Sequence, residues 1–363
     1  MASLSDSSST VLIRCSQDGF REINIRQEKL TTIIGWCLDL NELCTLFFEL
    51  SNKDRLMILD QLTKGAMNVT KLSKKLGLTI QEASRHVSRL DEAKLIFKDA
   101  AGLCHLTSYG KLVLKQTEGF KFLSQHEEYF VSHFPGHLPT QFVSSLAELA
   151  GSTFVKEVVV SYANVENMVH DAEEYVWTIT DQYLISRSTL ASFLRAFDRG
   201  VCVKNVEAKD WVVSDSQIGL YSAGDKELRE HARTSGLLKE RLSEQLDLCL
   251  YMSEKEVALL AFPSNDGRFD YLGFTSKDKR AHQWCFDIFN HYWEKAVDRQ
   301  TIVEELYQQL EKVPNIINLL DKIAAGKEVI DPKDLVLRLE NMLLTKQGKL
   351  TALGRLVLRR LKE

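Results

Sequence analysis

Residues 79–90, Thr-Ile-Gln-Glu-Ala-Ser-Arg-His-Val-Ser-Arg-Leu, carry side chains suited to contacts with phosphates and base edges. Thr79 and Glu82 have the spacing of a capping box, in which each side chain satisfies a free backbone amide at the start of a helix. One face of the predicted helix is apolar: Ala83, Val87 and Leu90. The opposite face is polar and cationic: Gln81, Ser84, Arg85, Ser88 and Arg89. Such a face fits the major groove of double-stranded DNA.

The elements around this helix predict a winged helix. A capping signal at residues 51–54 opens a helix that Gly65 ends, with three leucines expected to point inward: Leu56, Leu59 and Leu62. Asn68 or Thr70 opens a short second helix, and a Gly-containing turn over residues 76–79 leads into the polar helix, as in a helix-turn-helix. Apolar runs at 95–98 and 103–106 around a Gly-containing loop predict a β-hairpin.

We expect the DNA contacts to come from the polar helix and from the hairpin. The candidate residues are Thr79, Gln81, Ser84, Arg85, Ser88, Arg89, Lys98 and His105. Arg85 and Arg89 are the first candidates for guanine or phosphate contacts, and Gln81 and Ser84 for base edges. Lys98 and His105 would reach the adjacent backbone or minor groove. A homodimer would place two such helices in successive major grooves, which predicts an inverted-repeat operator.

Charge supports a nucleic-acid partner. Residues 51–118 hold 12 Lys and Arg against 7 Asp and Glu, a net charge of +5, whereas the whole chain carries −4. A basic module inside an acidic chain is typical of a DNA-binding domain. The alternative is a winged helix that contacts only proteins, with its lysines simply solvated.

The composition limits the remaining classes. The chain has 363 residues, 44% hydrophobic and 26% charged, which suits two or three globular domains. No apolar run is long enough for a membrane span, and the hydroxyl-rich first ten residues do not form a signal peptide. The seven cysteines are scattered without a CxxC pair, which favours reduced thiols in a cytoplasmic protein and indicates no zinc site.

The chain is predicted to be an α+β multidomain protein. Residues 1–35 form a tail or arm, with short strands possible at 10–14 and 22–25. Residues 36–134 form the winged helix-turn-helix with a long following helix, and the Pro- and Gly-containing stretch 133–139 marks a boundary. Residues 140–296 form an α/β domain. Residues 297–363 form a C-terminal helical module.

The α/β domain is predicted to contain a mainly parallel sheet built from βαβ units. The expected strands are 157–160, 175–180, 201–206, 248–251, 256–262 and 269–274. The expected helices are 164–172, 190–198 and one from about Lys277. The sequence Asn265-Asp-Gly267 is a strong hairpin turn between the last two strands.

The C-terminal module repeats part of the winged helix. Residues 349–359 match residues 105–115 at six of eleven positions, at an offset of 244. A weaker match pairs residues 319–323 with 58–62 at an offset of 261, so that 17 residues are lost between the two matches. We interpret the module as a degenerate winged helix that lacks the helix for the groove. Its basic end, residues 345–362, is expected to play a structural role rather than to contact phosphates.

Three histidines lie close together in sequence: His126, His133 and His137. Their spacing matches no metal-ligand motif, so we interpret them as histidines at a loop and helix end and expect no metal site. We also expect no cofactor.

The chain resembles two known families. The segments 50–56, 84–90 and 106–110 are similar to ArsR-like archaeal winged-helix transcriptional regulators. The later segments 172–182, 199–201, 262–267, 270–271, 284 and 292–296 resemble the middle domain of the methanogenesis-regulator (filament-related) family. Together the resemblance covers roughly residues 40–297. It implies a phospholipase D-like middle domain without catalysis, which senses an effector or dimerises.

A phosphodiesterase of the phospholipase D-like class is the first alternative. Its catalysis needs a histidine followed two residues later by a lysine, and no histidine of this chain has that neighbour. His231-Ala-Arg233 is the nearest approximation, and a second copy is missing. No nucleotide-binding or hydrolase motif appears. We therefore expect no catalytic residue.

A second alternative is a non-specific chromatin-type DNA-binding protein, although the size of the middle domain disfavours it. Four aromatic residues of that domain could line a pocket for a small-molecule effector: Trp177, Trp211, Phe269 and Trp284. Aromatics at this spacing are more often part of a core. An effector would act by binding two states of the protein with different affinities.

Overall fold

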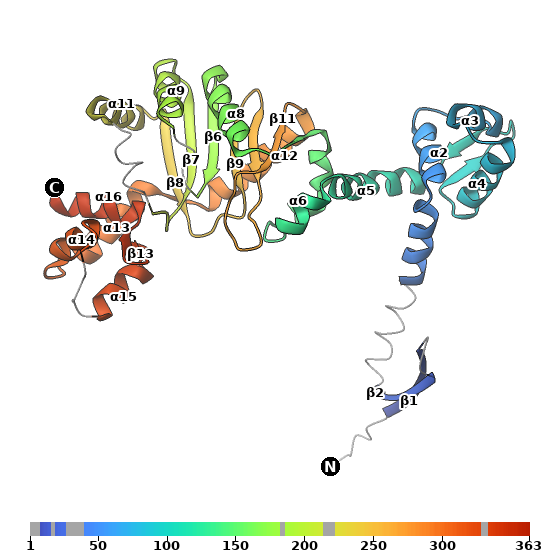
Figure 1. The fold of residues 1–363 in the computed structure, drawn as a ribbon, viewed down its shortest axis with the longest axis horizontal. Helices are drawn as coiled ribbons and strands as arrows, with labels where there is room; N and C mark the ends of the chain where they lie inside the picture. The colour runs from blue at the N-terminus through green and yellow to red at the C-terminus, as the bar shows by residue number, and fades with distance from the viewer. Residues whose placement is uncertain (1–7, 16–18, 27–39, 182–185, 213–221, 328–332) are drawn as a thin grey trace, which may run out of the picture. The chain divides into compact units, whose positions relative to one another are not determined.

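The computed structural model describes residues 8–15, 19–26, 40–181, 186–212, 222–327 and 333–363. These residues fall into two compact units, residues 1–117 and 118–363 (Figure 1). The division lies within one long helix, upstream of the stretch 133–139 on which the sequence-based boundary depends.

The first unit begins with a β-hairpin. Strands β1 (Ser8–Cys15) and β2 (Gly19–Arg26) pair antiparallel, from Ser8 opposite Arg26 to Cys15 opposite Gly19. The two short strands expected at 10–14 and 22–25 are therefore present and longer than predicted. Residues 40–50 are helical. Residues 36–39, with which the predicted winged-helix domain begins, lie outside the described residues.

A winged helix follows, in the predicted order. Helices α2 (Lys53–Thr63), α3 (Val69–Leu76) and α4 (Ile80–Glu92) precede strands β3 (Ile96–Lys98) and β4 (Cys104–Leu106). Helix α5 (Ser108–Gln125) continues from the hairpin. Gly77 adopts a left-handed φ of 69° at the turn between α3 and α4, which residues with a Cβ rarely adopt. Asn52, within the predicted capping signal, and Asn68, one of the two predicted openings, accept hydrogen bonds from the first turns of α2 and α3.

Leucines and valines from all the helices of this winged helix fill its core. Leu59 and Leu62 point inward as predicted, but Leu56 is 38% exposed and Ile58 is fully buried instead. The prediction for Leu56 was wrong because 3.6-residue periodicity fixes a face only within about one position.

The second unit is organised around an eight-stranded sheet of order β12-β8-β7-β6-β9-β10-β11-β5. Its strands are β5 (Thr153–Val155), β6 (Tyr175–Thr180), β7 (Cys202–Ala208), β8 (Leu238–Ser243), β9 (Cys249–Ser253), β10 (Val257–Ala261), β11 (Gly273–Ser276) and β12 (Val297–Asp298). Its helices are α6 (Glu127–Ser132), α7 (Thr140–Ser144), η1 (Leu146–Gly151), α8 (Val158–Asp171), α9 (Arg187–Asp198), α11 (Ala223–Thr234) and α12 (Lys279–Lys295).

The expectation of a mainly parallel sheet was wrong. Only β6-β7 and β7-β8 pair parallel. The crossover from β6 through α9 to β7 was predicted, whereas α11 and β8 were not. The other five pairings are antiparallel. Three of them, β6-β9, β11-β5 and β12-β8, join strands that are not consecutive in the chain. Short connections account for the other two: three residues join β9 to β10, and the turn at Asn265–Gly267 lies in the connection from β10 to β11. Connections this short allow only antiparallel neighbours.

Two predicted strands also differ from the structure. Residues 157–160 begin helix α8, with Glu157 at its N-cap and the three valines that follow exposed. A short apolar run cannot be assigned to strand or helix by periodicity alone. Of the strand predicted over 269–274, only the last two residues are in a strand, since β11 begins at Gly273.

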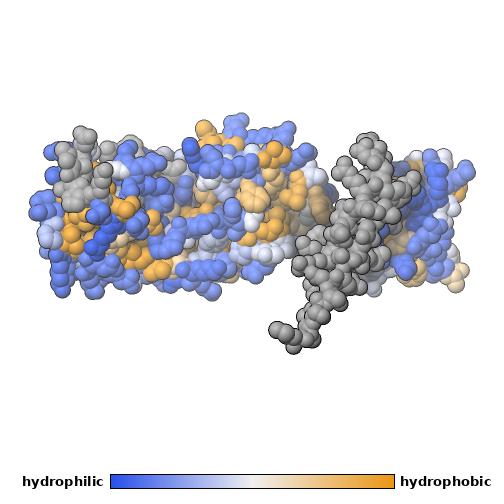
Figure 2. Space-filling view, turned by 90° about the horizontal axis from the view of Figure 1, so that it is seen from below, coloured by the Kyte–Doolittle hydropathy of each residue, from blue (hydrophilic) through white to orange (hydrophobic). Residues whose placement is uncertain are grey.

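Both faces of the sheet are covered. Helix α12 and η1 pack on one face, around Trp177 and Phe289. Helices α8 and α9 pack on the other, around Tyr251 and Leu259 (Figure 1). On the face seen in Figure 2, hydrophobic side chains reach the surface in small groups separated by hydrophilic ones. No helix among the described residues is long and apolar enough to cross a membrane.

The C-terminal module lies beside the β8 edge of the sheet (Figure 1) and has its own core. It contains α13 (Arg299–Leu310), α14 (Ile316–Ala324), α15 (Lys333–Asn341), β13 (Thr345–Lys346), β14 (Lys349–Leu350) and α16 (Ala352–Lys362). The last three elements have the order hairpin then helix, as in the winged helix.

The same corner closes the hairpin in both copies. Thr107 Oγ1 donates to Lys94 O at 2.7 Å, and Thr351 Oγ1 donates to Leu343 O at 2.7 Å. Lys94 and Leu343 both have left-handed backbones, with φ of 60° and 57°. Gly110 and Gly354 lie in the first turns of the following helices, so close to a carbonyl oxygen that an added Cβ would lie 2.1 Å from it. The sequence repeat is therefore a structural repeat.

This corner corrects the predicted alignment. Lys94 follows α4 and Leu343 follows α15, an offset of 249, so α15 occupies the place of α4. Of the 17 lost residues, 12 fall before α15 and five fall within the hairpin. The helix for the groove is thus retained, and the described residues between α14 and α15 contain no counterpart of α3. Asp334 and Leu337 of α15 stand where α4 has Arg85 and Ser88, and both are exposed.

Candidate nucleic-acid interface

Helix α4 is fixed at its N-terminus by the predicted capping box. Glu82 N donates to Thr79 Oγ1 at 3.2 Å, and Thr79 N donates to Glu82 Oε2 at 2.9 Å. The backbone hydrogen bond from Thr79 is the main reason that the pKa of Glu82 lies below its ordinary value. The predicted apolar stripe is fully buried, and His86 joins it: Ala83, His86, Val87 and Leu90. These contacts leave the opposite side of α4 outward.

Four of the predicted contact residues lie on that outward side. Gln81, Ser84, Arg85 and Ser88 are exposed. Arg85 forms no ion pair or side-chain hydrogen bond within the part of the chain that the structure describes. Its guanidinium can therefore form two parallel hydrogen bonds to a guanine or a phosphate without first breaking an internal bond.

Two predicted contact residues have internal partners instead. The Thr79 hydroxyl donates to Glu82 Oε2 at 2.8 Å as part of the cap. Arg89 donates to Glu49 through Nη2 at 2.5 Å and Nε at 3.1 Å, although its side chain is 40% exposed. The hydrogen bond from Arg89 is the main cause that lowers the pKa of Glu49, and it raises the pKa of Arg89 in turn. Arg89 thus serves first to attach α4 to the helix at residues 40–50.

A second arginine completes this attachment. Arg55 Nε donates to Glu49 O at 2.6 Å, and Arg55 Nη2 donates to Phe48 O at 2.6 Å. The guanidinium carbons of Arg89 and Arg55 lie 5.1 and 5.8 Å from the centre of the Phe48 ring. Sequence reasoning missed Phe48, Glu49 and Arg55, because contacts between side chains of different helices follow no spacing rule.

The hairpin presents one of its two predicted residues to solvent. Lys98 is exposed. His105 is half-buried; its Nε2 lies 2.8 Å from Asp99 Oδ2, and its ring stacks on Phe97 with centroids 5.1 Å apart. The hydrogen bond with His105 is the main cause that lowers the pKa of Asp99, which also accepts from the backbone of the hairpin loop. His105 therefore shapes the loop that carries Lys98.

Helix α3 adds cations that sequence reasoning did not single out. Lys71, Lys74 and Lys75 are exposed, and Lys75 Nζ lies 3.2 Å from Gln61 Oε1. The first helix of a helix-turn-helix crosses the DNA backbone, where lysines neutralise phosphates without reading sequence. The signal was available in the run Lys-Leu-Ser-Lys-Lys at residues 71–75.

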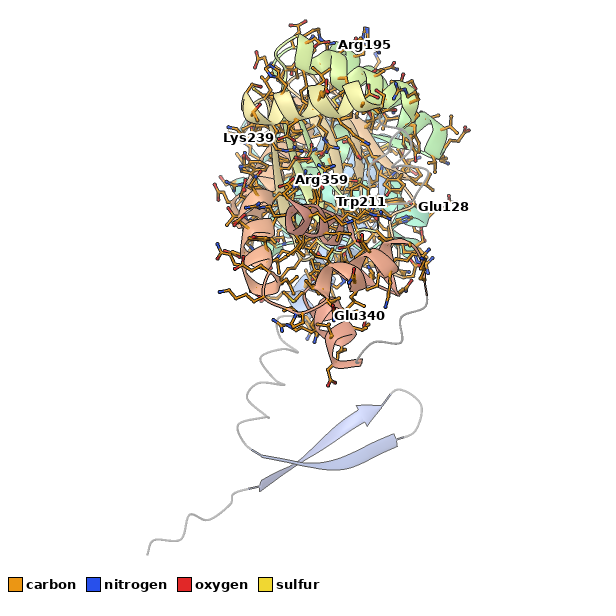
Figure 3. All side chains as sticks on the ribbon, turned by 90° about the vertical axis from the view of Figure 1, so that its left-hand side faces the viewer. Glu128, Arg195, Trp211, Lys239, Glu340 and Arg359 are labelled. Carbon is orange, nitrogen blue, oxygen red and sulfur yellow. The ribbon has the colours of Figure 1, made fainter. Side chains whose placement is uncertain are left out.

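The four aromatics predicted to line an effector pocket do not gather in one place. Trp177 and Trp284 are buried in the core on the α12 face of the sheet, where the Trp177 ring stacks on Phe289. Phe269 is buried in the core on the opposite face. Trp211, labelled in Figure 3, follows β7, and its carbonyl accepts a hydrogen bond from Ala352 N at 2.6 Å. The structure does not form a shared pocket from these aromatics, because they come from four separate segments and pack on opposite faces of the sheet.

His126 and His133, which were considered as possible metal ligands, pack against aromatic side chains. His133 is buried, stacks on Tyr129, and lies 3.0 Å from Asp270 Oδ2 through Nε2. His126 packs against Phe274. Within the described residues there is no group of three or more metal-binding side chains. Arg233, the phosphate-binding candidate two residues after the exposed His231, donates to Glu240 through Nε and Nη2.

Comparisons with known proteins support the helix-turn-helix assignment. A family described as "Helix-turn-helix domain" matches residues 50–96, which include α2, α3 and α4. The chain therefore contains a helix-turn-helix domain. No curated protein sequence matches this chain.

Three solved structures are similar at low identity. TrmBL2, described as an archaeal chromatin protein with a novel mode of DNA binding, is 15% identical with a TM-score of 0.32, over 68% of this chain and 94% of that one. Nuc, a phospholipase D family member from Salmonella typhimurium, is 13% identical with a TM-score of 0.26, over 38% and 88%. The mitomycin 7-O-methyltransferase MmcR is 13% identical with a TM-score of 0.21, over 57% and 65%. TM-scores this low carry no conclusion about fold or function.

Proposed function

We propose that this protein is a transcriptional regulator that binds double-stranded DNA sequence-specifically through α4. The observation that carries the proposal is the exposed polar face of α4, with Arg85 at its centre, on a helix whose other side is buried. The exposed lysines of α3 and Lys98 of the hairpin supply phosphate contacts on either side of it. The helix-turn-helix match over residues 50–96 covers the same segment.

We further propose that the protein acts as a homodimer. A pair of α4 helices bound one helical turn of DNA apart reads a palindromic site. The winged-helix unit has exposed apolar side chains that a second copy can cover, among them Leu40 and Leu43 on the helix at 40–50 and Leu112 on α5. Contiguous exposed apolar patches mark interfaces between subunits, and Leu40 and Leu43 lie one turn apart on one helix. The second unit acts in this proposal as the regulatory part, in line with the resemblance of its middle domain to a regulator family.

Selection from random DNA tests both proposals. Purified full-length protein is used to enrich bound fragments, and the affinity for the enriched duplex is then measured over a series of salt concentrations. The expected result is an inverted-repeat site, with affinity that falls steeply as salt rises because phosphate neutralisation releases counterions. Enrichment of no sequence, together with a steep salt dependence, would instead show the non-specific chromatin-type binding. Absence of any duplex binding would refute the DNA-binding function itself.

A further inference from the structure

A buried carboxylate joins three arginines at one edge of the central sheet. The side chain of Glu240 on β8 is 2% exposed. Its Oε1 accepts hydrogen bonds from Arg229 Nη2 at 2.6 Å and Arg299 Nη1 at 2.7 Å, and its Oε2 accepts from Arg233 Nη2 at 2.8 Å. Burial would raise the pKa of Glu240, but the three guanidinium groups outweigh it and hold this pKa below its ordinary value. The cluster holds α11, β8 and α13 together.

These elements form the walls of a cleft with a volume of about 770 Å³. Strand β12 pairs only with Arg241 and Leu242 of β8, so the start of β8 is left open along this edge. Helix α11 lies along one side, and the N-terminus of α13 and the last turns of α16 lie along the other. The charged lining residues are Lys226, Glu227, Glu230, Arg233, Lys239, Glu240, Arg241, Asp298, Arg299, Arg359, Arg360 and Glu363.

Most carboxylates of the cleft are already occupied. Glu230 pairs with Arg233, and Glu363 lies 3.8 Å from Arg360. Asp298 Oδ1 accepts hydrogen bonds from the first turn of α13. Among the described residues, only Glu227 of the lining carboxylates has no cationic or capping partner. The cleft therefore has little negative charge left to offset further cations.

Four lining cations have no carboxylate partner within the described parts of the chain: Lys226, Lys239, Arg241 and Arg359. They come from α11, β8 and α16, so they surround the cleft. Figure 3 shows Lys239 and Arg359 at this end of the second unit, between α11 and the C-terminal helices. Cations from separate elements that converge on one hollow form a focused positive potential.

A neighbouring lysine lies close to two of these cations. Lys204 Nζ lies 4.7 and 5.2 Å from the ring centres of Trp177 and Trp293. Burial lowers the pKa of Lys204, and repulsion from Lys239 and Arg241 lowers it further. Arg241 is held against Trp293: its guanidinium carbon lies 4.5 Å from the centre of the Trp293 ring, and its Nη1 donates to Trp293 O at 2.6 Å. Arg241 is thus held in place before any ligand arrives.

We propose that this cleft binds phosphate groups of a polyanionic ligand, with Lys239 and Arg359 as the principal contacts. Guanidinium and ammonium groups are the usual phosphate ligands of proteins. The volume lies within the range of small-molecule sites and exceeds what a single phosphate needs. A ligand that contacts both β8 and α16 ties the central domain to the C-terminal module. The site does not depend on DNA recognition by α4.

Titration with sodium tripolyphosphate tests the site. Full-length protein is titrated by calorimetry at constant ionic strength, and the double variant Lys239→Gln, Arg359→Gln is compared with the control Lys156→Gln, Lys312→Gln. The control removes two exposed cations outside the cleft, one from each part of the second unit. We expect saturable binding to the wild type and the control, and binding weaker by about tenfold or more in the cleft variant.

A second arm identifies the source of the phosphate. The affinity for the enriched duplex is measured for the same variants in an Arg85→Ala background. A cleft variant that loses affinity for both tripolyphosphate and duplex assigns the site to DNA backbone phosphates; loss for tripolyphosphate alone assigns it to a phosphorylated small molecule. The proposal is overturned if the wild type shows no saturable tripolyphosphate binding, or if the cleft variant binds as tightly as the control. Lys239→Gln alone serves if the double variant does not fold.

Discussion

Arg89 and Glu49 form a two-point ion pair across 40 positions of sequence, with Nη2 and Nε donating to the two carboxylate oxygens. Glu49 is buried, so its charge depends on Arg89 and on Arg55 for compensation. Arg89, which was predicted to contact DNA, therefore stabilises the fold instead. Arg85, four positions earlier, is left as the exposed arginine of α4.

The two arginines are therefore expected to have different roles. Arg85→Ala should weaken binding to the selected operator by about 1–3 kcal/mol, with base preference relaxed at one position, and leave thermal stability unchanged. Gel-shift titration and thermal melting measure the two effects. Unchanged operator affinity in the Arg85→Ala protein would remove α4 from its proposed role.

Arg89→Ala should instead destabilise the winged helix, by about 1–3 kcal/mol, because a buried carboxylate loses charge-assisted hydrogen bonds. Denaturant unfolding of the full chain measures this. Ser88→Ala, which removes an exposed side chain from the same helix, is the matched control and should change stability by less than about 0.5 kcal/mol. Equal stability of the Arg89→Ala and Ser88→Ala proteins would contradict the assigned role of the ion pair.

Acid should weaken the same contact. The pKa of Glu49 in the folded protein lies below its ordinary value of 4.5, chiefly because of the hydrogen bond from Arg89. A carboxyl group whose pKa is lowered by folding stabilises the fold above its unfolded pKa, and this stabilisation is lost as pH falls through the lowered value. Unfolding free energy measured between about pH 7 and pH 3 should therefore fall less steeply in Arg89→Ala than in the wild type. A parallel pH dependence in the two proteins would count against the pair.

The repeated corner predicts a matched pair of stability defects. An alanine at Gly110 or Gly354 would bring its Cβ to 2.1 Å from the carbonyl oxygen of Leu95 or Leu344. Each change should cost about 1–3 kcal/mol of stability, since backbone must move to accept the methyl group. Gly224→Ala on α11 is the control, because its added Cβ meets nothing within 4 Å. Differential scanning calorimetry compares the stability of the three variants. A Gly354→Ala protein as stable as the Gly224→Ala control would contradict the prediction.

Lys98 should contribute to affinity without contributing to specificity. Lys98→Ala is expected to weaken duplex binding about equally for operator and unrelated DNA, and to reduce the slope of log affinity against log salt by about 1. A filter-binding salt series on both duplexes measures this. A selective loss for the operator would show that the hairpin reads bases instead.

Local signals were sufficient for the winged helix. Thr79 and Glu82 fix the start of α4, and the buried stripe from Ala83 to Leu90 fixes its orientation. The ion pair of Arg89 could not be predicted, because Glu49 is 40 residues away and no periodic rule connects the two. The antiparallel part of the sheet was missed for a similar reason: strand direction depends on long-range pairing, which periodicity within one strand does not encode.

The exchange of Arg85 and Ser88 for Asp334 and Leu337 in α15 bears on which substitutions each segment can accept. The second segment keeps the buried corner that its fold requires, while an acidic and an apolar side chain stand where α4 exposes an arginine and a serine, and an acidic side chain repels phosphates. Substitutions on the exposed face of α4 should accordingly be limited by the contacts it makes, whereas those on the exposed face of α15 should be limited only by whether the segment still folds.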